Sequence, residues 1–469
     1  MKRFVTLLLS GALSVPLLAQ QGPVLATYTV GNTTVSASAL TGNLDTPWEL
    51  LWGPDNFLWL TERGGTISRV NPSTGQVLPL LTITDVTETG ESGLLGMAVH
   101  PNFTATPYIY VVYNYTAAGA LKEKLVRYTY SSTANTLGSP LILLDNIAAV
   151  TTHSGSRLLI QPDLTLLMTT GDAQQRPEAQ NAASLNGKVL RLNLDGTVPA
   201  NNPTPGSLVY SLGHRNPQGL VRTPSGTIYS SEHGENVEDE VNLIEPNRNY
   251  GWPMVEGFCN TPTEQPFCTA NNMREPLVAY TPTLAVAGLT YYTHPAIPEW
   301  NNSLLLVSLK AGTLTQLQLN PAGTQISSQS NLWAGTYGRL RAVCVSPQGR
   351  VYVATSNRDG RGNPAATDDR ILVLENRAYI PSSVKNGRAS ALQLWPNPAT
   401  QTVAVRLPAA TRTATTVHLH DALGRAVRTS PLPAGRQEAQ LSLTGLPSGF
   451  YLVQTQLDDT RYTQRLVVE

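Results

Sequence analysis

A turn-and-strand pattern recurs along most of the chain and limits the folds that the chain can adopt. Each copy has a Pro, Asn or Gly turn, an alternating strand of Leu, Ile, Val and Tyr, a polar loop and a second strand. Six copies occur: GPDNFLWLTERGGTISRVNP; TPYIYVVYNY with EKLVRYTY; QPDLTLLMTTGD with GKVLRLNLDG; TPSGTIYSSEHGE with DEVNLIEP; WNNSLLLVSLKAGTLTQLQLNP; and SPQGRVYVATSNRDG with DRILVLEN. A small antiparallel sheet cannot bury both faces alone, so the six units predict radial stacking in a six-bladed β-propeller.

The composition agrees with an all-β chain and argues against two classes of partner. Residue usage leans toward Thr, Val, Leu, Tyr, Gly and Pro, as expected for short strands joined by turns. Charged residues make up 14% of the chain, with 32 basic against 32 acidic, so no excess charge favours nucleic acid or an acidic membrane. No segment after the N-terminal region approaches the roughly 18 apolar residues of a membrane span.

The two ends of the chain differ from the repeat. The opening MKRFVTLLLSGALSVPLLAQ has the basic start, apolar core and small-residue exit of a secretory signal peptide over residues 1–20. The propeller is expected over 21–380 and a linker over 381–391, and alternating strands resume over 392–469 as a small β-sandwich. We therefore expect export to the periplasm, followed by secretion or display at the cell surface.

Three cysteines complete this description. Cys259 and Cys268 lie in a polar, Pro-containing loop where an exported protein can close a short disulfide. Cys344 lies in an alternating apolar strand and is expected to be an inert buried thiol. No His or second Cys pair stands nearby at the spacing of metal ligands.

Polar side chains gather where predicted strands end, most densely in SLGHRNPQGL. The candidates are Glu91, His153, Arg215, Asn216, the acidic run Glu238, Asp239 and Glu240, Lys310, Arg339 and Arg341. If the propeller axis gathers the four cations of this set, they form a pocket for a small polyanionic ligand, because guanidinium groups pair carboxylates bidentately.

Simpler interpretations of the same residues remain open at this point. A lone His such as His153 is more often structural than catalytic, and Arg339 and Arg341 could form a solvated strand face. The acidic run could be an ordinary charged loop or, with backbone carbonyls, a calcium site. No phosphate-binding Gly loop and no Gly-x-Ser-x-Gly elbow occurs, which disfavours nicotinamide and serine-hydrolase chemistry.

From about Asp45 to Glu375 the chain resembles the soluble pyrroloquinoline-quinone-dependent sugar dehydrogenases, the glucose/sorbosone and aldose sugar dehydrogenase family. The motifs that carry the resemblance are GLLGMAVHPNF, HSGSRL with TTGD, GKVLRLNLDG, LGHRNPQGL, DEVNLIEPNRNYGWP and SLKAG. The resemblance implies a six-bladed propeller that oxidises the anomeric hydroxyl of aldoses to lactones by hydride transfer to pyrroloquinoline quinone. Electrons would then pass to an external acceptor.

The resemblance also assigns roles to the polar candidates. His153 matches the general base, and Arg215 matches the residue that stabilises charge on the quinone oxygens. Cofactor binding falls on Glu91, Arg215, Asn216, Lys310, Arg339 and Arg341. One calcium ion would bind the carbonyls of Gly234 and Glu235, and a second would bind Glu240 and the Tyr250 carbonyl, with Asp239 nearby.

Several positions depart from the family pattern. Glu91 stands where the family usually has Gln, and Thr152 stands where some glucose-oxidising members have Asp. Val286, Ala287 and Gly288 replace the commoner Pro-Ser-Gly, and Tyr280 stands near a position where a Trp often covers the cofactor. These departures bear on the substrate more than on the cofactor.

Residues Leu392 to Glu469 resemble the type A sorting domain of the type IX secretion system, through LWPNP, DALGR, GLPSGFYLVQ and the closing QRLVVE. The resemblance implies the type IX machinery as a partner. A carbohydrate-binding or Ig-like adhesive module is the alternative, but no aromatic platform accompanies Trp395.

Two further functions compete with the sugar dehydrogenase hypothesis. The propeller could bind glycan or protein without catalysis, as Glu91 and the altered 280s loop would permit, or it could be a calcium-dependent lactonase. The joint presence of His153, Arg215, Asn216, Lys310 and the Arg339/Arg341 pair favours the dehydrogenase.

Overall fold

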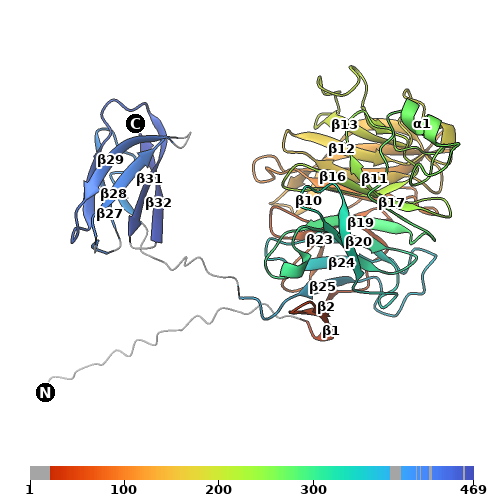
Figure 1. Cartoon of the computed structure of the whole chain (residues 1–469), viewed down its shortest axis with the longest axis horizontal. Coiled ribbons are helices and arrows are strands. Elements are labelled where there is room, and N and C mark those ends of the chain that lie inside the picture. Colours follow the sequence, from red (N-terminus) through yellow and green to blue (C-terminus); the bar gives the residue numbers. More distant parts are fainter. Residues whose placement is uncertain (1–21, 381–391, 408, 412, 422–424, 458–459) are drawn as a thin grey trace. The chain divides into compact units, whose positions relative to one another are not determined.

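The structure is a computed structural model that describes residues 22–469 apart from 381–391, 408, 412, 422–424 and 458–459. The expected signal peptide and linker lie outside the described residues. The chain divides into two compact units, one ending at Tyr379 and the other beginning at Ile380 (Figure 1).

Within the described part of the first unit, the strands form six antiparallel sheets. Five sheets have four strands: β3 (Pro47–Trp52), β4 (Leu58–Glu62), β5 (Thr66–Val70) and β6 (Val77–Thr82); β7 (Leu94–Val99), β8 (Tyr108–Ala117), β9 (Ala120–Ser131) and β10 (Thr136–Ala148); β11 (Gly155–Ile160), β12 (Thr165–Thr170), β13 (Lys188–Asn193) and β14 (Val209–Leu212); β15 (Pro217–Arg222), β16 (Ile228–Glu232), β17 (Asp239–Ile244) and β18 (Val278–Tyr280); and β19 (Val286–Tyr292), β20 (Ser303–Ser308), β21 (Leu314–Leu319) and β22 (Ile326–Asn331). The sixth sheet joins β23 (Leu340–Val345), β24 (Val351–Thr355) and β25 (Ile371–Glu375) to β2 (Thr33–Thr41) and β1 (Val24–Val30).

The first strands of the six sheets form a closed ring. Strands β3, β7, β11, β15, β19 and β23 contact one another in turn, and β23 contacts β3 again. The sixth sheet is completed from the other end of the unit, because β2 pairs with β25 in antiparallel register. This arrangement is consistent with a β-propeller, and each of the six sequence repeats contributes two paired strands to a different sheet.

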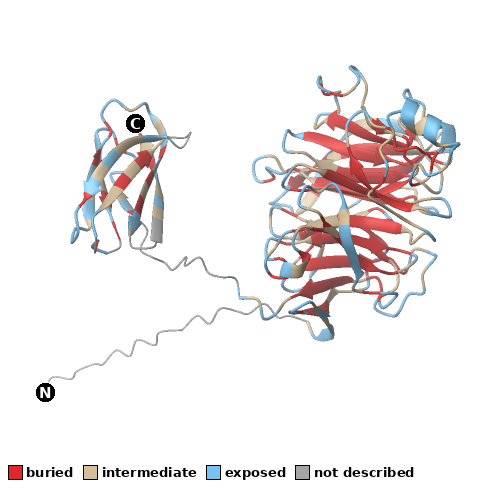
Figure 2. Ribbon diagram, in the orientation of Figure 1, coloured by how far each residue is buried: buried red, intermediate tan, exposed pale blue. Residues whose placement is uncertain are grey.

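Alternating apolar residues explain why the sheets pack against one another. The strands are mostly buried, whereas the connecting loops carry most of the exposed residues (Figure 2). Leu372 and Leu374 of β25 share one core cluster with Val35 and Ala37 of β2 and with Val353 of β24. The inserted N-terminal strand is thus held by apolar packing as well as by hydrogen bonds.

The cysteine predictions are confirmed. Cys259 and Cys268 form a disulfide across a short excursion that contains α1 (Gln265–Ala270), a helical turn where the sequence predicted only a loop. Cys344 is a buried free thiol, and burial raises its pKa, which keeps it unreactive.

The described part of the second unit has two sheets. One contains β26 (Gln393–Trp395), β27 (Thr402–Arg406) and β30 (Glu438–Ser442), and the other contains β28 (Thr415–His420), β29 (Ala426–Leu432), β31 (Gly449–Leu457) and β32 (Thr460–Val468). Val403 and Leu441 from the first sheet share a core with Val417, Leu419 and Val453 from the second. Neither unit has, among its described residues, a helix long and apolar enough to cross a membrane.

Truncating the closing sheet should destabilise the first unit. Leu374 is fully buried, so Leu374→Ala should lower the free energy of unfolding by about 2–5 kcal/mol through lost burial and the cavity left behind. Leu141 on β10 is 44% exposed, so Leu141→Ala is the matched control and should stay within about 0.5 kcal/mol of wild type. Chemical denaturation measures both, and equal losses would contradict the role of the β2–β25 core.

Candidate active site

A cavity of about 400 Å³ opens at one end of the strand ring. Its lining comes from the loops that lead into first strands, such as Glu91 and His153, and from the loops that leave second strands, such as Gly234 and Lys310. In an antiparallel sheet, the start of one strand and the end of the next lie at the same edge. Loops far apart in the sequence therefore converge on a single site.

The structure brings most of the predicted site residues together in this cavity. Those that line it are Glu91, His153, Arg215, Asn216, Gly234, Glu235, Asp239, Lys310, Arg339 and Arg341. Glu240 and Tyr250 do not line it. The four predicted cations are gathered in one pocket, as the sequence analysis expected.

His153 is oriented by a carboxylate that the sequence analysis quoted in TTGD but gave no role. The Nδ1 atom of His153 lies 2.8 Å from Oδ1 of Asp172, whose other oxygen accepts a 2.8 Å hydrogen bond from the indole N–H of Trp252. Burial alone would raise the pKa of Asp172, but the hydrogen bonds from His153, Gln174 and Trp252 hold it below its usual range. Asp172 is thus a carboxylate that directs Nε2 of His153 away from itself.

Close approach of two loops makes this pairing possible. A Cβ on Gly171 would lie 1.8 Å from the carbonyl oxygen of His153, so only glycine permits the contact. The neighbouring Thr152 hydroxyl accepts a hydrogen bond of 2.5 Å from the side chain of Gln174. No carboxylate occupies the Thr152 position, as the sequence already indicated.

The cations of the cavity fall into two groups. Arg339 pairs with Asp359 at 2.7 Å, Arg361 with Glu91 at 3.1 Å, and Arg63 with Glu88 at 3.0 Å. The other three, Arg215, Lys310 and Arg341, have no carboxylate partner within 4.0 Å among the described residues.

Arg341 is the most deeply placed of the unpaired cations. It is 5% exposed, its Nη1 donates a 2.7 Å hydrogen bond to Gln218, and its guanidinium lies 5.7 Å from the Trp48 ring centroid. Burial lowers the pKa of Arg341 to about 9, although Asp359 and Glu91 oppose this shift. A buried cation of this kind is stabilised by an anionic ligand.

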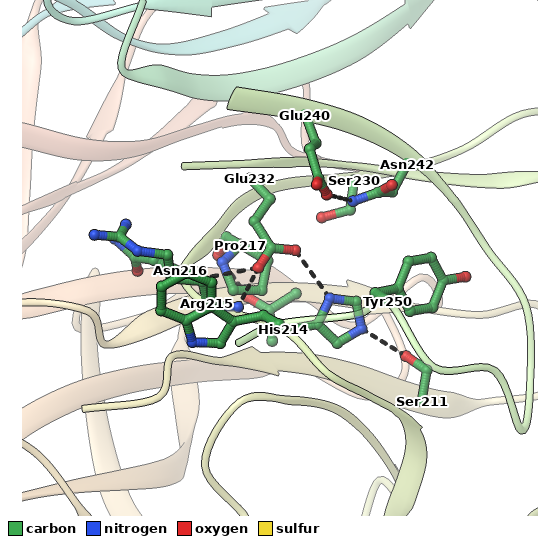
Figure 3. A network of polar contacts seen from close by, with 12 residues as sticks. Ser211, His214, Arg215, Asn216, Pro217, Ser230, Glu232, Glu240, Asn242 and Tyr250 are labelled. Carbon is green, nitrogen blue, oxygen red and sulfur yellow. Dashed lines mark hydrogen bonds and ion pairs between the residues drawn. The ribbon is translucent and has the colours of Figure 1, made fainter. Parts of the chain in front are cut away.

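The SLGHRNPQGL segment contains both bracing and lining residues (Figure 3). Glu232 accepts hydrogen bonds from the His214 ring at 2.9 Å and from the backbone N–H groups of Arg215 and Asn216. The second His214 nitrogen lies 2.9 Å from the Ser211 hydroxyl, and the ring is fully buried. His214 therefore braces the loop, as the sequence analysis expected.

Asn216 and Gln218 connect this loop to its neighbours. The Asn216 side-chain oxygen accepts hydrogen bonds from the Gly155 N–H at 3.1 Å and from Gln218 at 2.9 Å. The guanidinium of Arg215 lies 5.3 Å from the Trp252 ring centroid. Trp252 thus contacts both Arg215 and the carboxylate that orients His153.

The predicted calcium ligands occupy two different environments. Asp239 lines the cavity, but its Oδ1 accepts from the Gly234 N–H, and its Oδ2 accepts from the N–H groups of Leu284 and Val286. Asp239 therefore anchors two loops through backbone hydrogen bonds. Glu235 pairs with Arg176.

Glu240 is buried and does not line the cavity. Its carboxyl accepts hydrogen bonds from Asn242 at 2.8 Å and from the Gly257 N–H at 2.7 Å, and burial followed by the charge of Glu232 raises its pKa to about 8. The side-chain oxygen of Asn242 is buried without a hydrogen-bond donor. Among the described residues, no group of three or more His, Cys, Asp or Glu side chains is placed to hold a metal ion.

The structure shows where the residues that depart from the family pattern lie. Burial would raise the pKa of Glu91, but His233, Arg361 and Arg341 hold it below its usual range, so Glu91 is a carboxylate. Tyr280 does not line the cavity but donates a hydrogen bond to Gln329. Thr283 and Ala285 of the same loop do line it.

A buried acid, Glu123, supports the segment that follows His153 through hydrogen bonds. Glu123 of β9 accepts a 2.9 Å hydrogen bond from Ser156 and a 3.4 Å hydrogen bond from Asn114. Asn114 also accepts hydrogen bonds from Ser154 and from the Gly93 N–H. Burial raises the pKa of Glu123 to about 8, so the side chain is mostly protonated at neutral pH.

Comparison with known proteins gives two family matches. Residues 44–372 match the glucose/sorbosone dehydrogenase family, and residues 393–469 match the secretion system C-terminal sorting domain.

Individual relatives agree with the first match. The chain is 34% identical to quinoprotein glucose dehydrogenase B of Acinetobacter calcoaceticus, over 71% of this chain and 87% of the relative. It is 28% identical to aldose sugar dehydrogenase YliI of Escherichia coli, over 70% of this chain and 91% of the relative. The solved PQQ-bound aldose sugar dehydrogenase of Streptomyces coelicolor superposes with a TM-score of 0.64 at 32% identity, over 73% of this chain and 98% of that one.

The buried acid Glu123 should make the stability of the protein depend on pH. The folded protein holds a proton on Glu123 that the unfolded chain releases near pH 4.5, so raising the pH from 4.5 to 8 should lower the free energy of unfolding. The contribution of Glu123 is on the order of 5 kcal/mol across that window. Glu123→Gln should flatten this part of the profile, as measured by denaturant unfolding at several pH values.

The exposed Glu275 supplies the control for this experiment. Glu275→Gln should keep the wild-type slope. An unchanged slope in Glu123→Gln would show that Glu123 does not carry the proton.

Proposed function

The chain belongs to the glucose/sorbosone dehydrogenase family, and on that premise we propose that it is an exported oxidoreductase that uses pyrroloquinoline quinone to convert the anomeric hydroxyl of aldoses to lactones. One observation carries the proposal. A single cavity places a carboxylate-oriented histidine, His153, beside the unpaired cations Arg215, Lys310 and Arg341. A proton acceptor and an anion-binding surface thus meet in one site.

The residues present fit the cofactor. Pyrroloquinoline quinone is a planar tricarboxylate, and Arg215, Lys310 and Arg341 would hold its carboxylates and quinone oxygens, with Arg339 beside them. Buried polar atoms without partners also lie at this cavity, namely Nε of Arg215 and Nε2 of His233. A polar ligand would satisfy both atoms.

His153 performs the acid–base part of the proposed reaction. When bound, pyrroloquinoline quinone supplies the two-electron acceptor that takes hydrogen and its electron pair from the anomeric carbon. Nε2 of His153 accepts the proton of the hydroxyl on the same carbon, because Nδ1 is engaged with Asp172. Asp172 stabilises the imidazolium that results, and Trp252 and Gln174 hold Asp172 in place.

Arg215 and Asn216 prepare the site for this proton transfer. The fixed charge of Arg215 would stabilise negative charge on a bound quinone, and Trp252 supports its guanidinium. Asn216 holds the Gly155 N–H and so fixes the loop that carries His153. An external electron acceptor, a cytochrome or a quinone, would take the electrons from the reduced cofactor.

Calcium is part of the same proposal. Carbonyls of Gly234 and Glu235 would bind one ion next to the cofactor, and Glu240 with the Tyr250 carbonyl would bind another. The side-chain oxygen of Asn242, which accepts no hydrogen bond, and the raised pKa of Glu240 fit a bound cation at the second position. Asp239 would act through its anchoring of the Gly234 loop.

The architecture extends the proposal to export. The six sheets of the first unit would be the blades of a six-bladed propeller over residues 21–380, and the two sheets of the second unit would form a β-sandwich over 392–469. Residues 393–469 are a type IX secretion sorting domain, which directs the chain to the cell surface or beyond. Residues 1–20 would act as the signal peptide for the preceding step, and 381–391 as the linker.

Reconstitution tests the proposed function. Purified protein treated with a chelator should gain saturable dye reduction with aldoses only after pyrroloquinoline quinone and calcium are both added. Cofactor binding without turnover on any aldose would favour a non-catalytic propeller, and lactone hydrolysis with calcium alone would favour a lactonase. Either result, or no cofactor binding at all, would refute the proposal.

Two single substitutions should separate the acid–base and binding roles. His153→Gln should lower kcat by roughly 10²–10⁴-fold while leaving the cofactor dissociation constant close to wild type. Arg341→Gln should instead weaken cofactor binding by about tenfold or more, because it removes a buried cation from the anion site. Fluorescence titration and steady-state kinetics measure the two effects, and normal turnover in the His153 variant would rule out the assigned base.

A further inference from the structure

An ion pair joins two loops on the solvent side of the cavity. Glu91, between β6 and β7, and Arg361, between β24 and β25, lie 3.1 Å apart from Oε1 to the guanidinium. Their side chains are 26% and 61% exposed, and both line the cavity. The pair therefore connects elements that belong to different sheets.

The same pair lies beside the proposed base. The second carboxylate oxygen of Glu91 lies 3.4 Å from the backbone N–H of His153, which donates to it. A substrate whose hydroxyl reaches Nε2 of His153 would approach next to Glu91 and Arg361. These two charged side chains therefore line the same cavity as the proposed base and contact the loop that carries it.

The neighbouring rim charges have other partners. Glu235 is paired with Arg176, and Asp359 is paired with Arg339. Lys310 is exposed, and its ammonium donates to the Thr283 hydroxyl, but it belongs to the cations assigned to the cofactor. Glu91 and Arg361 are thus rim charges paired with each other, and Glu91 also contacts the backbone of the proposed base.

We propose that the Glu91–Arg361 ion pair determines which substrate charge the site accepts. The site then selects uncharged aldoses over uronic acids. This inference rests on the proposed function and names its substrate class. While paired, the two side chains neutralise each other, so the Arg361 guanidinium is not free to bind a sugar carboxylate. Released from Glu91, Arg361 would bind a sugar carboxylate through two parallel hydrogen bonds.

A double-variant cycle tests the proposal. The measured quantity is the ratio of kcat/KM for glucuronate to kcat/KM for glucose. It is compared between wild type, Glu91→Gln, Arg361→Gln and the combined variant. Glu91→Gln should raise the ratio about five- to tenfold, since it frees an exposed guanidinium. Arg361→Gln should lower it, and the combined variant should return to within about twofold of wild type, because it restores a neutral pair.

Two measurements add readouts beyond the activity ratio. Arg361→Gln leaves Glu91 unpaired near an anionic cofactor, so the dissociation constant of pyrroloquinoline quinone should rise several-fold and recover in the combined variant. The raised ratio in Glu91→Gln should fall as salt is added, because exposed charges are screened. A cofactor affinity that does not recover in the combined variant would overturn the neutral-pair explanation.

A matched control distinguishes the effect of the Glu91–Arg361 pair from the effect of removing any exposed positive charge from the same loop. Arg358 is exposed in the same loop as Arg361 but does not line the cavity, and it donates to the Asp368 carbonyl. Arg358→Gln should leave the ratio unchanged, and an equal shift there would overturn the proposal. Wild-type turnover of glucose with equal ratios in all variants would refute this inference alone, whereas no wild-type turnover of any aldose would refute the proposed function.

Discussion

Pairing between β2 and β25 is the contact on which the rest of the first unit depends. It joins the N-terminal strand to the last sheet, and the apolar side chains of both strands enter the same core cluster. The ring of first strands can then close between β23 and β3. Closure fixes the distances between loops that are hundreds of residues apart in sequence, and the site consists almost entirely of such loops. Arg341 of β23, for example, donates to Gln218 of β15, 123 positions earlier.

Within the closed ring, electrostatics divides the cavity into two parts. Arg341 is deeply buried without a carboxylate partner, and Arg215 and Lys310 are likewise unpaired among the described residues. A buried cation such as Arg341 without a counterion is costly for a folded protein, so an anionic ligand best explains this arrangement. On the side of His153, in contrast, the charges are matched: Asp172 faces the imidazole, and Arg361 faces Glu91. The division agrees with an anionic cofactor and an uncharged substrate sharing one cavity.

The sequence predicted the strands and the lining residues well, because both leave local patterns. Alternating apolar residues identify the paired strands of each sheet, and polar residues at strand ends identify the loops that face the cavity. Pairings between distant residues leave no such pattern. Asp172 was quoted in the TTGD motif without a role, and the approach of Gly171 to the His153 loop, with the hydrogen bond to His153, shows that role. Arg361, in the loop between β24 and β25, was missed for the same reason, since its partner lies 270 positions earlier at Glu91.

The charge of Glu91 is compensated by a residue far away in the sequence, Arg361. The family resemblance implies an amide at the Glu91 position, and an unpaired carboxylate there would add negative charge near an anionic cofactor and oppose its binding. Arg361 removes that charge by pairing, and the flanking cations keep the pKa of Glu91 low, so the carboxylate stays ionised and paired. The pair then keeps the rim neutral, as an amide would, but joins two loops that an amide could not hold by charge. The exchange at Glu91 is therefore compatible with cofactor binding, provided that Arg361 is present.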